Sequence, residues 1–571
     1  MTIRRALTAL TFAAAALACW LALAWLVSDT RSHPTPLTLT ESLTLGGEFV
    51  RAEASLDRSR TLFRHDCLDF SWTVTGAALV SVDDAPVEAA GRRAVCEREQ
   101  VTLTLTGAGG ATWARPFHHW ALFDFAEAHA LLFGGLALAV LSIGLLRPWR
   151  GGLSGAILRA APVQVAIAGA TALALALLLD LFTNTLDTSR YTWDWVHYLD
   201  MAQNGIAGNA GLVAPYAYRP LPPLLANLFA DATGRPVLTG FRLLAYAGIV
   251  GQMGMAFALA RLFLTGARRF WGAFAVMLVV GLTTPAAKFY LFDVLRTDPL
   301  AFPLVLLAAY ALVRRERASR DGRLPLGWDT LLVATSLLGM SAREFAVLPL
   351  AMLGACALRD LVQRRRAGYS LLVGLAAAGT AAAGYLLPRL LIPVGRSDQL
   401  FNVISPVELA VLWPRNLNLL LGFVLALLPL WMLSSPGRAR RLWKRVGGLR
   451  LPLGVYMLGV IGLSWAGGTD ISRFMAFLHV PLVLLLACLI EDGIPAWQVL
   501  LALGAWGLFQ RPFDAVPQVT LDNYLDFYIV YWDRQSVVTW ARVGEAAAWV
   551  AGIWALRGAA WGGGRLLKAP R

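Results

Sequence analysis

Apolar runs long enough to cross a lipid bilayer recur along most of this chain. A transmembrane helix needs about 20 predominantly apolar residues, and runs near or above that length are separated by short polar segments throughout residues 118–571. Hydrophobic residues make up 57% of the 571 residues and charged residues only 15%, which is far too apolar for a soluble globular protein. The sequence therefore predicts an all-α, polytopic membrane bundle over residues 118–571.

One stretch, residues 29–117, instead has the pattern of a water-soluble domain. Apolar and polar residues alternate at positions 70–74 and 101–105, and Gly, Asp and Pro turns separate such segments, as in half-buried strands. We therefore predict a small β-sandwich. Cys67 and Cys96 flank two of the predicted strands, and an oxidising compartment would favour a disulfide between them over two unpaired buried thiols.

The N-terminus resembles a secretion signal at first sight. Arg4 and Arg5 precede an apolar run from Ala6 to Val27. That run is too long for a typical signal peptide, and the residues after it form a poor cleavage site. We expect residues 1–28 to remain as a membrane anchor with the N-terminus in the cytoplasm, which places the predicted β-sandwich outside the cytoplasm.

Basic residues gather in short clusters between the apolar runs. The formal net charge of +14 could suggest a nucleic-acid partner, but basic clusters in these positions are what the positive-inside rule predicts for cytoplasmic loops. We therefore expect no nucleic-acid partner. Helices fitted between the clusters number about 14, with both chain ends in the cytoplasm. The clusters lie at residues 147–150, 268–269, 314–323, 359–366, 438–450 and 565–571.

The apolar run at 328–358 tests this topology. One long helix would put its two flanking basic clusters on opposite sides of the membrane, whereas a hairpin of two short helices keeps both in the cytoplasm. The hairpin brings Arg343 and Glu344 to the outer surface. The cytoplasmic loops are short, and no GxxxxGK[ST] sequence occurs, so an ATP-driven transporter carried on this chain is excluded.

The remaining polar residues gather in the predicted outer loops. In the first of these, Trp195, Tyr198, Leu199 and Ala202 recur at helical spacing, which predicts an amphipathic helix lying in the membrane interface. A functional site is therefore expected on the outer side. The loops cover residues 184–223, 286–298, 393–415, 467–474 and 511–541.

The first outer loop carries a recognisable order of residues. An aromatic-Asp-x-x-x-Tyr segment with Asp194 and Tyr198 ends in Asn204-Gly205, and Tyr218-Arg219 precedes a proline-rich start to the next span. This order resembles the first outer loop of GT-C glycosyltransferases, integral-membrane enzymes that take sugars from polyprenyl phosphates. The resemblance covers residues 160–360, with weaker support from Arg473, and implies a catalytic core over about residues 160–490.

The resemblance implies a role for several acidic residues. The family's loop carries a catalytic base or metal ligand, and this position matches Asp194. A second acidic residue often follows in the next outer loop, where Asp298 or Asp293 is the candidate. Asp187 and Asp200 share the first loop, and either could be the base if Asp194 only caps the helix. The anchor and β-domain precede the family-like part as an added module.

These residue types suit sugar transfer at the outer face of a bacterial inner membrane. A carboxylate such as Asp194 can remove the proton of an acceptor hydroxyl as it attacks the anomeric carbon, which gives inversion. The acceptor is a glycan, a lipid or a protein. The departing phosphate requires cationic donors, for which the candidates are Arg219, Arg343, Arg473 and Lys288.

Other contributions stay open at the level of sequence. Mg²⁺ or Mn²⁺ held by Asp194 and Asp298 would also stabilise the phosphate, although other family members use no metal. Arg343 and Glu344 could equally form a structural ion pair. The candidates for contacts with substrate are His197, Tyr198, Tyr218 and Glu344, and for His197 an interface hydrogen bond is favoured over metal ligation.

Three other functions remain as alternatives. A lipid-linked glycan ligase or polymerase would use a later outer loop, for which residues 393–415 and 511–541 are suitable. A flippase or secondary transporter of lipid-linked sugars would need charged or broken helices at mid-membrane and an internal repeat, and the sequence shows no repeat. A binding protein with a membrane anchor would not need so many spans.

Overall fold

The computed structural model describes the chain in several stretches. They are residues 36–121, 161–183, 194–397, 413–466, 471–513 and 540–566, without 58–59, 62–67, 96–99, 119, 207–208, 210 and 395, and with a few single positions before residue 27. The chain divides into two compact units, Met1–Ala161 with 515–518 and Pro162–Asp514 with Val519–Arg571. Asp187, Cys67 and Cys96 lie outside these residues, as does most of the predicted anchor. The anchor, the role of Asp187 and the disulfide therefore stay predictions.

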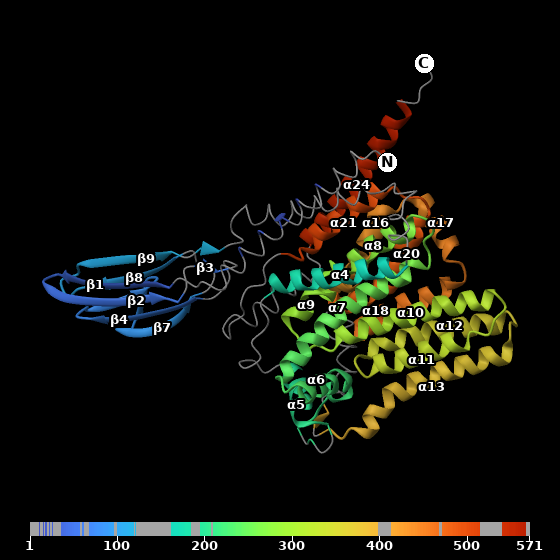
Figure 1. Ribbon diagram of the computed structural model, residues 1–571, viewed down its shortest axis with the longest axis horizontal. Coiled ribbons are helices and arrows are strands. Elements are labelled where there is room, and N and C mark those ends of the chain that lie inside the picture. Colours follow the sequence, from blue (N-terminus) through green and yellow to red (C-terminus); the bar gives the residue numbers. More distant parts are fainter. Residues whose placement is uncertain are drawn as a thin grey trace. The chain divides into compact units, whose positions relative to one another are not determined.

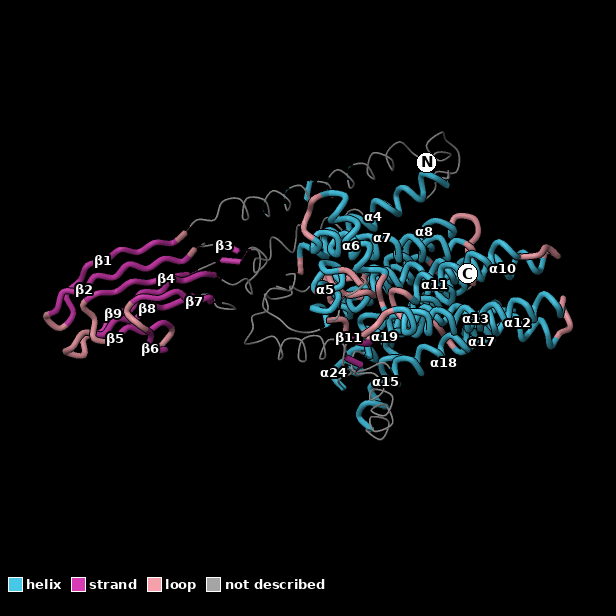
Figure 2. Tube along the Cα trace, turned by 90° about the horizontal axis from the view of Figure 1, so that it is seen from below, coloured by secondary structure: helices cyan, strands magenta, loops and turns pink. Residues whose placement is uncertain are grey.

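The first unit contains two four-stranded antiparallel sheets (Figure 1, Figure 2). The predicted strands at 70–74 and 101–105 fall within β4 and β8. One sheet has the order β1 (Leu37–Leu45), β2 (Glu48–Leu56), β4 (Leu68–Thr75) and β7 (Ala90–Val95); the other has β6 (Ala85–Val87), β5 (Leu79–Val82), β8 (Gln100–Thr106) and β9 (Thr112–His118). Two short strands, β3 (Arg60–Thr61) and β10 (Trp120–Ala121), pair in parallel.

Alternating side chains from both sheets form one hydrophobic cluster. In β4 every second residue is buried, from Leu68 to Val74, because successive side chains of a strand point to opposite faces. The rings of Phe70 in β4 and Phe117 in β9 meet edge to face with centroids 5.1 Å apart. The two sheets therefore share a core.

The second unit is a helical bundle. Its first half contains α4 (Ala161–Leu181), α5 (Asp194–Asn204), α6 (Leu221–Thr233), α7 (Val237–Arg261), α8 (Arg268–Gly281), α9 (Lys288–Phe292), α10 (Asp298–Arg320), α11 (Leu326–Met340), α12 (Leu348–Val362) and α13 (Ala367–Leu391). The second half contains α15 (Trp413–Ala426), α16 (Leu428–Leu433), α17 (Pro436–Val446), α18 (Arg450–Ala466), α19 (Ile471–Met475), α20 (His479–Glu491), α21 (Ala496–Gln510) and α24 (Trp540–Leu566). α20 is almost wholly buried and packs against α7, α8, α16 and α17.

Six helical stretches are long and apolar enough to cross a membrane among the described residues. The chain is thus a helical, membrane-embedded protein, while the predicted number of about 14 spans is not shown. Several apolar helices are shorter than a bilayer requires, such as α11 and α21. The six are Pro162–Leu181, Val237–Arg261, Glu344–Val362, Ala367–Leu391, Gly437–Trp465 and Arg473–Glu491.

The predicted helical hairpin is confirmed. α11 ends at Met340, the 3₁₀ helix η4 (Glu344–Val347) follows, and α12 continues from Leu348. Arg366, after α12, donates hydrogen bonds to the carbonyls of Gly322 and Arg323, before α11. The two ends of the hairpin therefore meet, and Figure 1 shows α10, α11, α12 and α13 as neighbouring layers.

Basic residues gather at one end of the bundle, which we call the basic end. Arg359 donates to the Gly448 carbonyl at 2.6 Å, and Arg268 donates to the Glu491 carbonyl at 3.1 Å. Arg317 likewise reaches the carbonyl of Leu262. The predicted clusters at 268–269, 314–323, 359–366 and 438–450 are therefore joined at this end.

A buried network of charges holds the basic end together. Arg315 lies 3.0 Å from Asp329, 2.7 Å from Glu316 and 3.3 Å from Asp360. Arg359 contacts Glu316 at 2.9 Å and Asp360 at 2.7 Å. These bonds connect α10, α11 and α12, and each buried charge has a partner, as burial of an ion requires.

Candidate functional site

A second group of buried charges lies at the opposite end of α10. Asp298 is the first residue of α10, and Arg315 follows it by seventeen positions. At 1.5 Å per residue this separation is about 26 Å, which approaches the roughly 30 Å thickness of a bilayer core. The group around Asp298 and the basic end therefore lie at opposite ends of α10, separated by a distance close to the thickness of a bilayer core.

Asp298 joins two arginines from different elements. Its Oδ2 accepts a hydrogen bond from Arg343 Nη1 at 2.7 Å and lies 3.8 Å from Arg473 Nε. Arg343 comes from the turn of the hairpin and Arg473 from α19. The Asp298 side chain has no solvent exposure, and the side chains of Arg343 and Arg473 are 5% and 8% exposed. The three residues form a desolvated ionic centre.

Aromatic rings surround these cations. Arg343 Cζ lies 5.1 Å from the centroid of Phe474, and Arg473 Cζ lies 5.4 Å from the same ring. Phe289 lies 5.6 Å from Arg473 Cζ and 5.7 Å from Arg296 Cζ. Such contacts stabilise cations that are removed from water.

A second ion pair adjoins the first. Arg219 Nε donates to both oxygens of Glu344 at 3.1 Å, and its Nη2 lies 3.0 Å from Oε2. Its Nη1 donates to the Tyr198 hydroxyl at 2.9 Å. Arg343 and Glu344 are neighbours in the chain, but each pairs with another segment: Arg343 with Asp298 of α10, and Glu344 with Arg219, just before α6.

The charge on Arg219 is held firmly. Burial alone would lower the pKa of its guanidinium, but the negative charge of Glu344 and the hydrogen bonds with Glu344 and Tyr198 outweigh burial and raise that pKa above its ordinary value. The Arg219 and Glu344 side chains are 15% and 29% exposed. An approaching anion therefore meets Arg219 before the deeper arginines.

Cationic side chains gather at this site. Arg296 pairs with Asp293 at 2.5 Å, and Lys288 is buried in α9. The four arginines of the site (Arg219, Arg296, Arg343 and Arg473) lie among three carboxylates (Asp293, Asp298 and Glu344). Guanidinium groups are the donors that bind phosphate and carboxylate groups with paired hydrogen bonds, so this arrangement suits an anionic ligand.

The predicted amphipathic helix exists as α5. Tyr198 and Ala202 are buried as the pattern predicts, Leu199 is half-buried, and Met201 is buried as well. Asp194 is the first residue of α5; its side chain lies outside the described part. Position 194 precedes Tyr198 by four residues, so the two positions share one face of the helix.

Other predicted residues have more local contacts. Asp200 accepts hydrogen bonds from Asn204 at 2.7 Å and Asn209 at 2.8 Å, which secure the turn after α5. The His197 ring stacks on Tyr216, with centroids 4.7 Å apart. Tyr218 belongs to the 3₁₀ helix η2 (Tyr216–Tyr218) and is buried.

Asp298 is a poor ligand for a divalent cation. One of its oxygens already accepts from Arg343 at 2.7 Å, and Arg473 faces the same atom, so a metal ion there would be repelled by both guanidinium groups. Among the described side chains no group of three His, Cys, Asp or Glu residues could hold a metal ion. The predicted Mg²⁺ or Mn²⁺ site with Asp194 depends on a side chain outside that part.

Two contacts that bring the outer segments together could not be found from sequence. The backbone N–H of Leu221 donates to the Ser341 carbonyl at 3.1 Å, which docks the start of α6 on the hairpin turn. Strand β11 (Val213–Ala214) pairs in parallel with β12 (Arg396–Ser397). Sequence reasoning also missed Arg389, whose only signal is a single charge inside an apolar run.

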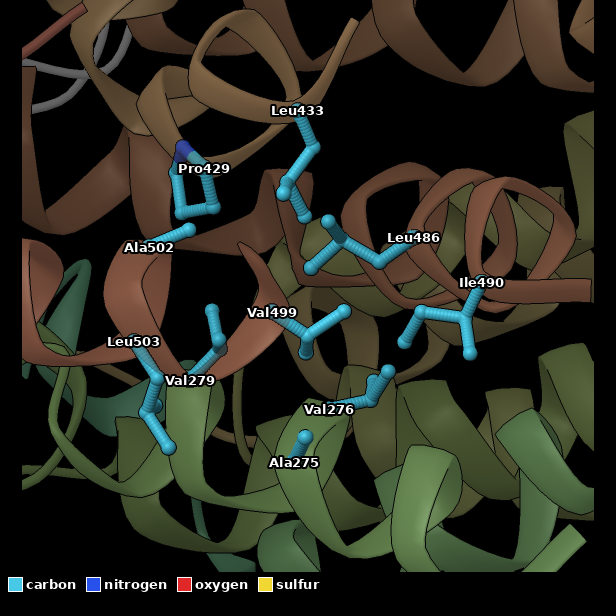
Figure 3. Close-up of a pocket in the computed structure, with 10 residues that line it drawn as sticks. All are labelled: Ala275, Val276, Val279, Pro429, Leu433, Leu486, Ile490, Val499, Ala502 and Leu503. Carbon is cyan, nitrogen blue, oxygen red and sulfur yellow. The ribbon is translucent and has the colours of Figure 1, made fainter. Parts of the chain in front are cut away.

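A small recess elsewhere in the bundle has no polar lining. Figure 3 shows Val276 of α8, Pro429 of α16, Leu486 of α20 and Val499 of α21 around it, and every lining residue is apolar. It offers no group for catalysis or for recognition of a polar ligand.

No protein-family model matches this chain, and no curated protein matches its sequence. The chemistry of the charged site is therefore the basis for assigning a function.

Proposed function

We propose that this protein is a GT-C-type glycosyltransferase of a bacterial inner membrane. It moves a sugar from a polyprenyl-phosphate donor to a hydroxyl of a glycan, lipid or protein acceptor, with inversion at the anomeric carbon. The observation that carries the proposal is the cation-rich site formed by Arg219, Arg343, Arg473 and Asp298 at the end of the bundle away from the basic end.

The leaving group explains why cations gather there. When the bond between the sugar and its phosphate breaks, negative charge develops on the phosphate oxygens, and fixed donors in a desolvated site stabilise that charge. Arg219 is the first arginine to contact the phosphate, because it is more exposed than Arg343 and Arg473. Arg343 and Arg473 are more deeply buried and add positive charge to the site, and Asp298 holds these two like charges together.

Asp194 is the general base in this proposal. The acceptor hydroxyl must lose its proton as it attacks, and a carboxylate within hydrogen-bond reach can take it. Position 194 begins α5, and Tyr198, one turn later, is bonded to Arg219. The base and the phosphate-binding arginine are thereby connected through one short helix.

The membrane orientation follows from the distribution of charge. If the basic end faces the cytoplasm, as the positive-inside rule requires, the site faces the periplasm. An anchor with its N-terminus in the cytoplasm makes the two-sheet unit a β-sandwich domain outside the cytoplasm, and the chain has about 14 spans. A donor attached to a lipid can reach such a site, whereas a sugar nucleotide cannot.

The site favours catalysis by guanidinium groups over catalysis by a metal ion. Three arginines supply the charge that Mg²⁺ or Mn²⁺ would supply, and the positions of Arg343 and Arg473 next to Asp298 oppose cation binding. This chemistry needs no cofactor.

The Asp194→Asn variant tests the proposal. Purified protein in lipid nanodiscs is incubated with radiolabelled polyprenyl-phosphate hexoses, pentoses and amino sugars, and with envelope extracts as acceptors. Wild type should transfer label from one donor class, and Asp194→Asn should lower the rate by about 10²-fold or more. Asp231→Asn, at an exposed position of α6, is the matched control. Equal rates for wild type and Asp194→Asn would remove Asp194 as the base.

A further inference from the structure

The membrane helix α13 has one charged side chain, and it lies beside the candidate site. Arg389 is the only charged residue of the 25-residue helix Ala367–Leu391. Its Cζ lies 4.5 Å from the ring centroid of Tyr218 and 3.6 Å from that of Tyr385, and its Nη1 donates to the Tyr385 carbonyl at 2.7 Å. Tyr218 directly precedes Arg219, so the contact brings α13 to the phosphate-binding candidate.

Exposed apolar side chains occur on α13 itself and on α6, which begins three residues after Tyr218. Leu390 and Leu391 are 77% and 73% exposed at the end of α13. On α6, which begins two residues after Arg219, Leu224 and Leu228 are also exposed and lie on one helix face. In a membrane protein such leucines contact acyl chains. Arg389 therefore lies where an apolar surface meets a cationic one.

A lone arginine near the end of a membrane helix often extends to the lipid headgroups only for its own solvation. Arg389 differs from such an arginine because the rings of Tyr218 and Tyr385 hold its guanidinium group in place. No carboxylate pairs with it among the side chains that the structure describes. An ordered arginine with free donor groups is well suited to bind a phosphate with two parallel hydrogen bonds.

We propose that Arg389, held between Tyr218 and Tyr385, binds the phosphate of the polyprenyl-phosphate donor where it leaves the bilayer for Arg219. The prenyl chain lies against the exposed leucines of α13 and α6. This inference rests on the proposed donor class, but it concerns binding of the lipid phosphate and can be tested without sugar transfer.

The test measures binding of radiolabelled undecaprenyl phosphate, without sugar, to the full chain in neutral-lipid nanodiscs. Wild type is compared with Arg389→Ala, Arg389→Lys and the matched control Arg365→Ala, an exposed arginine at the basic end. Competition with undecaprenol, phosphatidylglycerol and inorganic phosphate identifies the recognised group. Size-exclusion profiles establish that each variant is folded.

We expect Arg389→Ala to raise the dissociation constant about tenfold or more, as loss of a charge-assisted phosphate contact should. Arg389→Lys should retain part of the affinity, and Arg365→Ala all of it. Undecaprenol and inorganic phosphate should compete weakly, since each lacks half of the ligand. Should Arg389→Ala fail to fold, the Arg389→Lys variant decides, because loss of the planar donor pair must still weaken binding.

Two results would overturn the inference. Equal affinity of wild type and the folded Arg389 variants would remove Arg389 from the site, and equal competition by phosphatidylglycerol would make it a general headgroup contact. The proposed function stands if sugar transfer continues in either case. Conversely, binding that depends on Arg389 without transfer from any donor would retain the phosphate site and remove the glycosyltransferase.

Discussion

Replacing Asp298 by Asn should destabilise the protein strongly, because it removes the negative charge of a buried ionic centre. The side chain keeps nearly the same shape, so the effect of the charge is isolated. The variant leaves Arg343 and Arg473 as like charges in a site where the three side chains are 8% exposed or less. Breaking a buried ion pair by removing one partner typically costs about 3–5 kcal/mol. The amide oxygen of Asn can still accept from Arg343, so we expect a loss of about 3 kcal/mol in the free energy of unfolding.

The assay is unfolding of the purified protein in mixed micelles by increasing SDS, followed by tryptophan fluorescence. Asp231→Asn is the control for loss of a carboxylate at an exposed position. In a double-mutant cycle, Asp298→Asn with Arg343→Gln should cost less than the two single changes together, by about 0.5–3 kcal/mol. A loss below about 1 kcal/mol, or strictly additive losses, would refute the buried ionic centre.

Two further predictions concern α5 and the orientation of the bundle. Tyr198→Phe removes the hydrogen bond from Arg219 at 2.9 Å and should lower stability by about 1 kcal/mol in the same unfolding assay, and a change within error would exclude the contact. With the five native cysteines replaced by serine, Gln203→Cys on α5 should react with an impermeant maleimide in intact cells. Arg365→Cys should react only after permeabilisation, and the reverse pattern would place the site in the cytoplasm.

The sequence predicts the parts of this fold that depend on local pattern. Alternation at 70–74 corresponds to β4 and helical spacing corresponds to α5, because each element buries one face. The hairpin between α11 and α12 was predictable from charge, since its two basic flanks must lie on one side of the membrane. These features need no knowledge of distant contacts.

The pairing of charges could not be predicted in the same way. Arg219 and Glu344 are separated by 125 positions, and Arg343 and Asp298 by 45; nothing local shows that Glu344 would pair with Arg219 and not with its neighbour Arg343. Arg389 was missed because a run of apolar residues conceals one charge near a helix end. Span number is equally hard to predict, because short helices such as α16 interrupt the apolar runs.

If the cation-rich site cleaves a sugar from a lipid phosphate, each transfer must release one free polyprenyl phosphate. The decisive experiment measures free polyprenyl phosphate and glycosylated acceptor together, with purified wild-type protein in nanodiscs. The two products should appear in equal amounts from a polyprenyl-phosphate sugar, and neither should appear from a sugar nucleotide. Transfer from a sugar nucleotide, or no release of polyprenyl phosphate from any donor class, would overturn the proposed function.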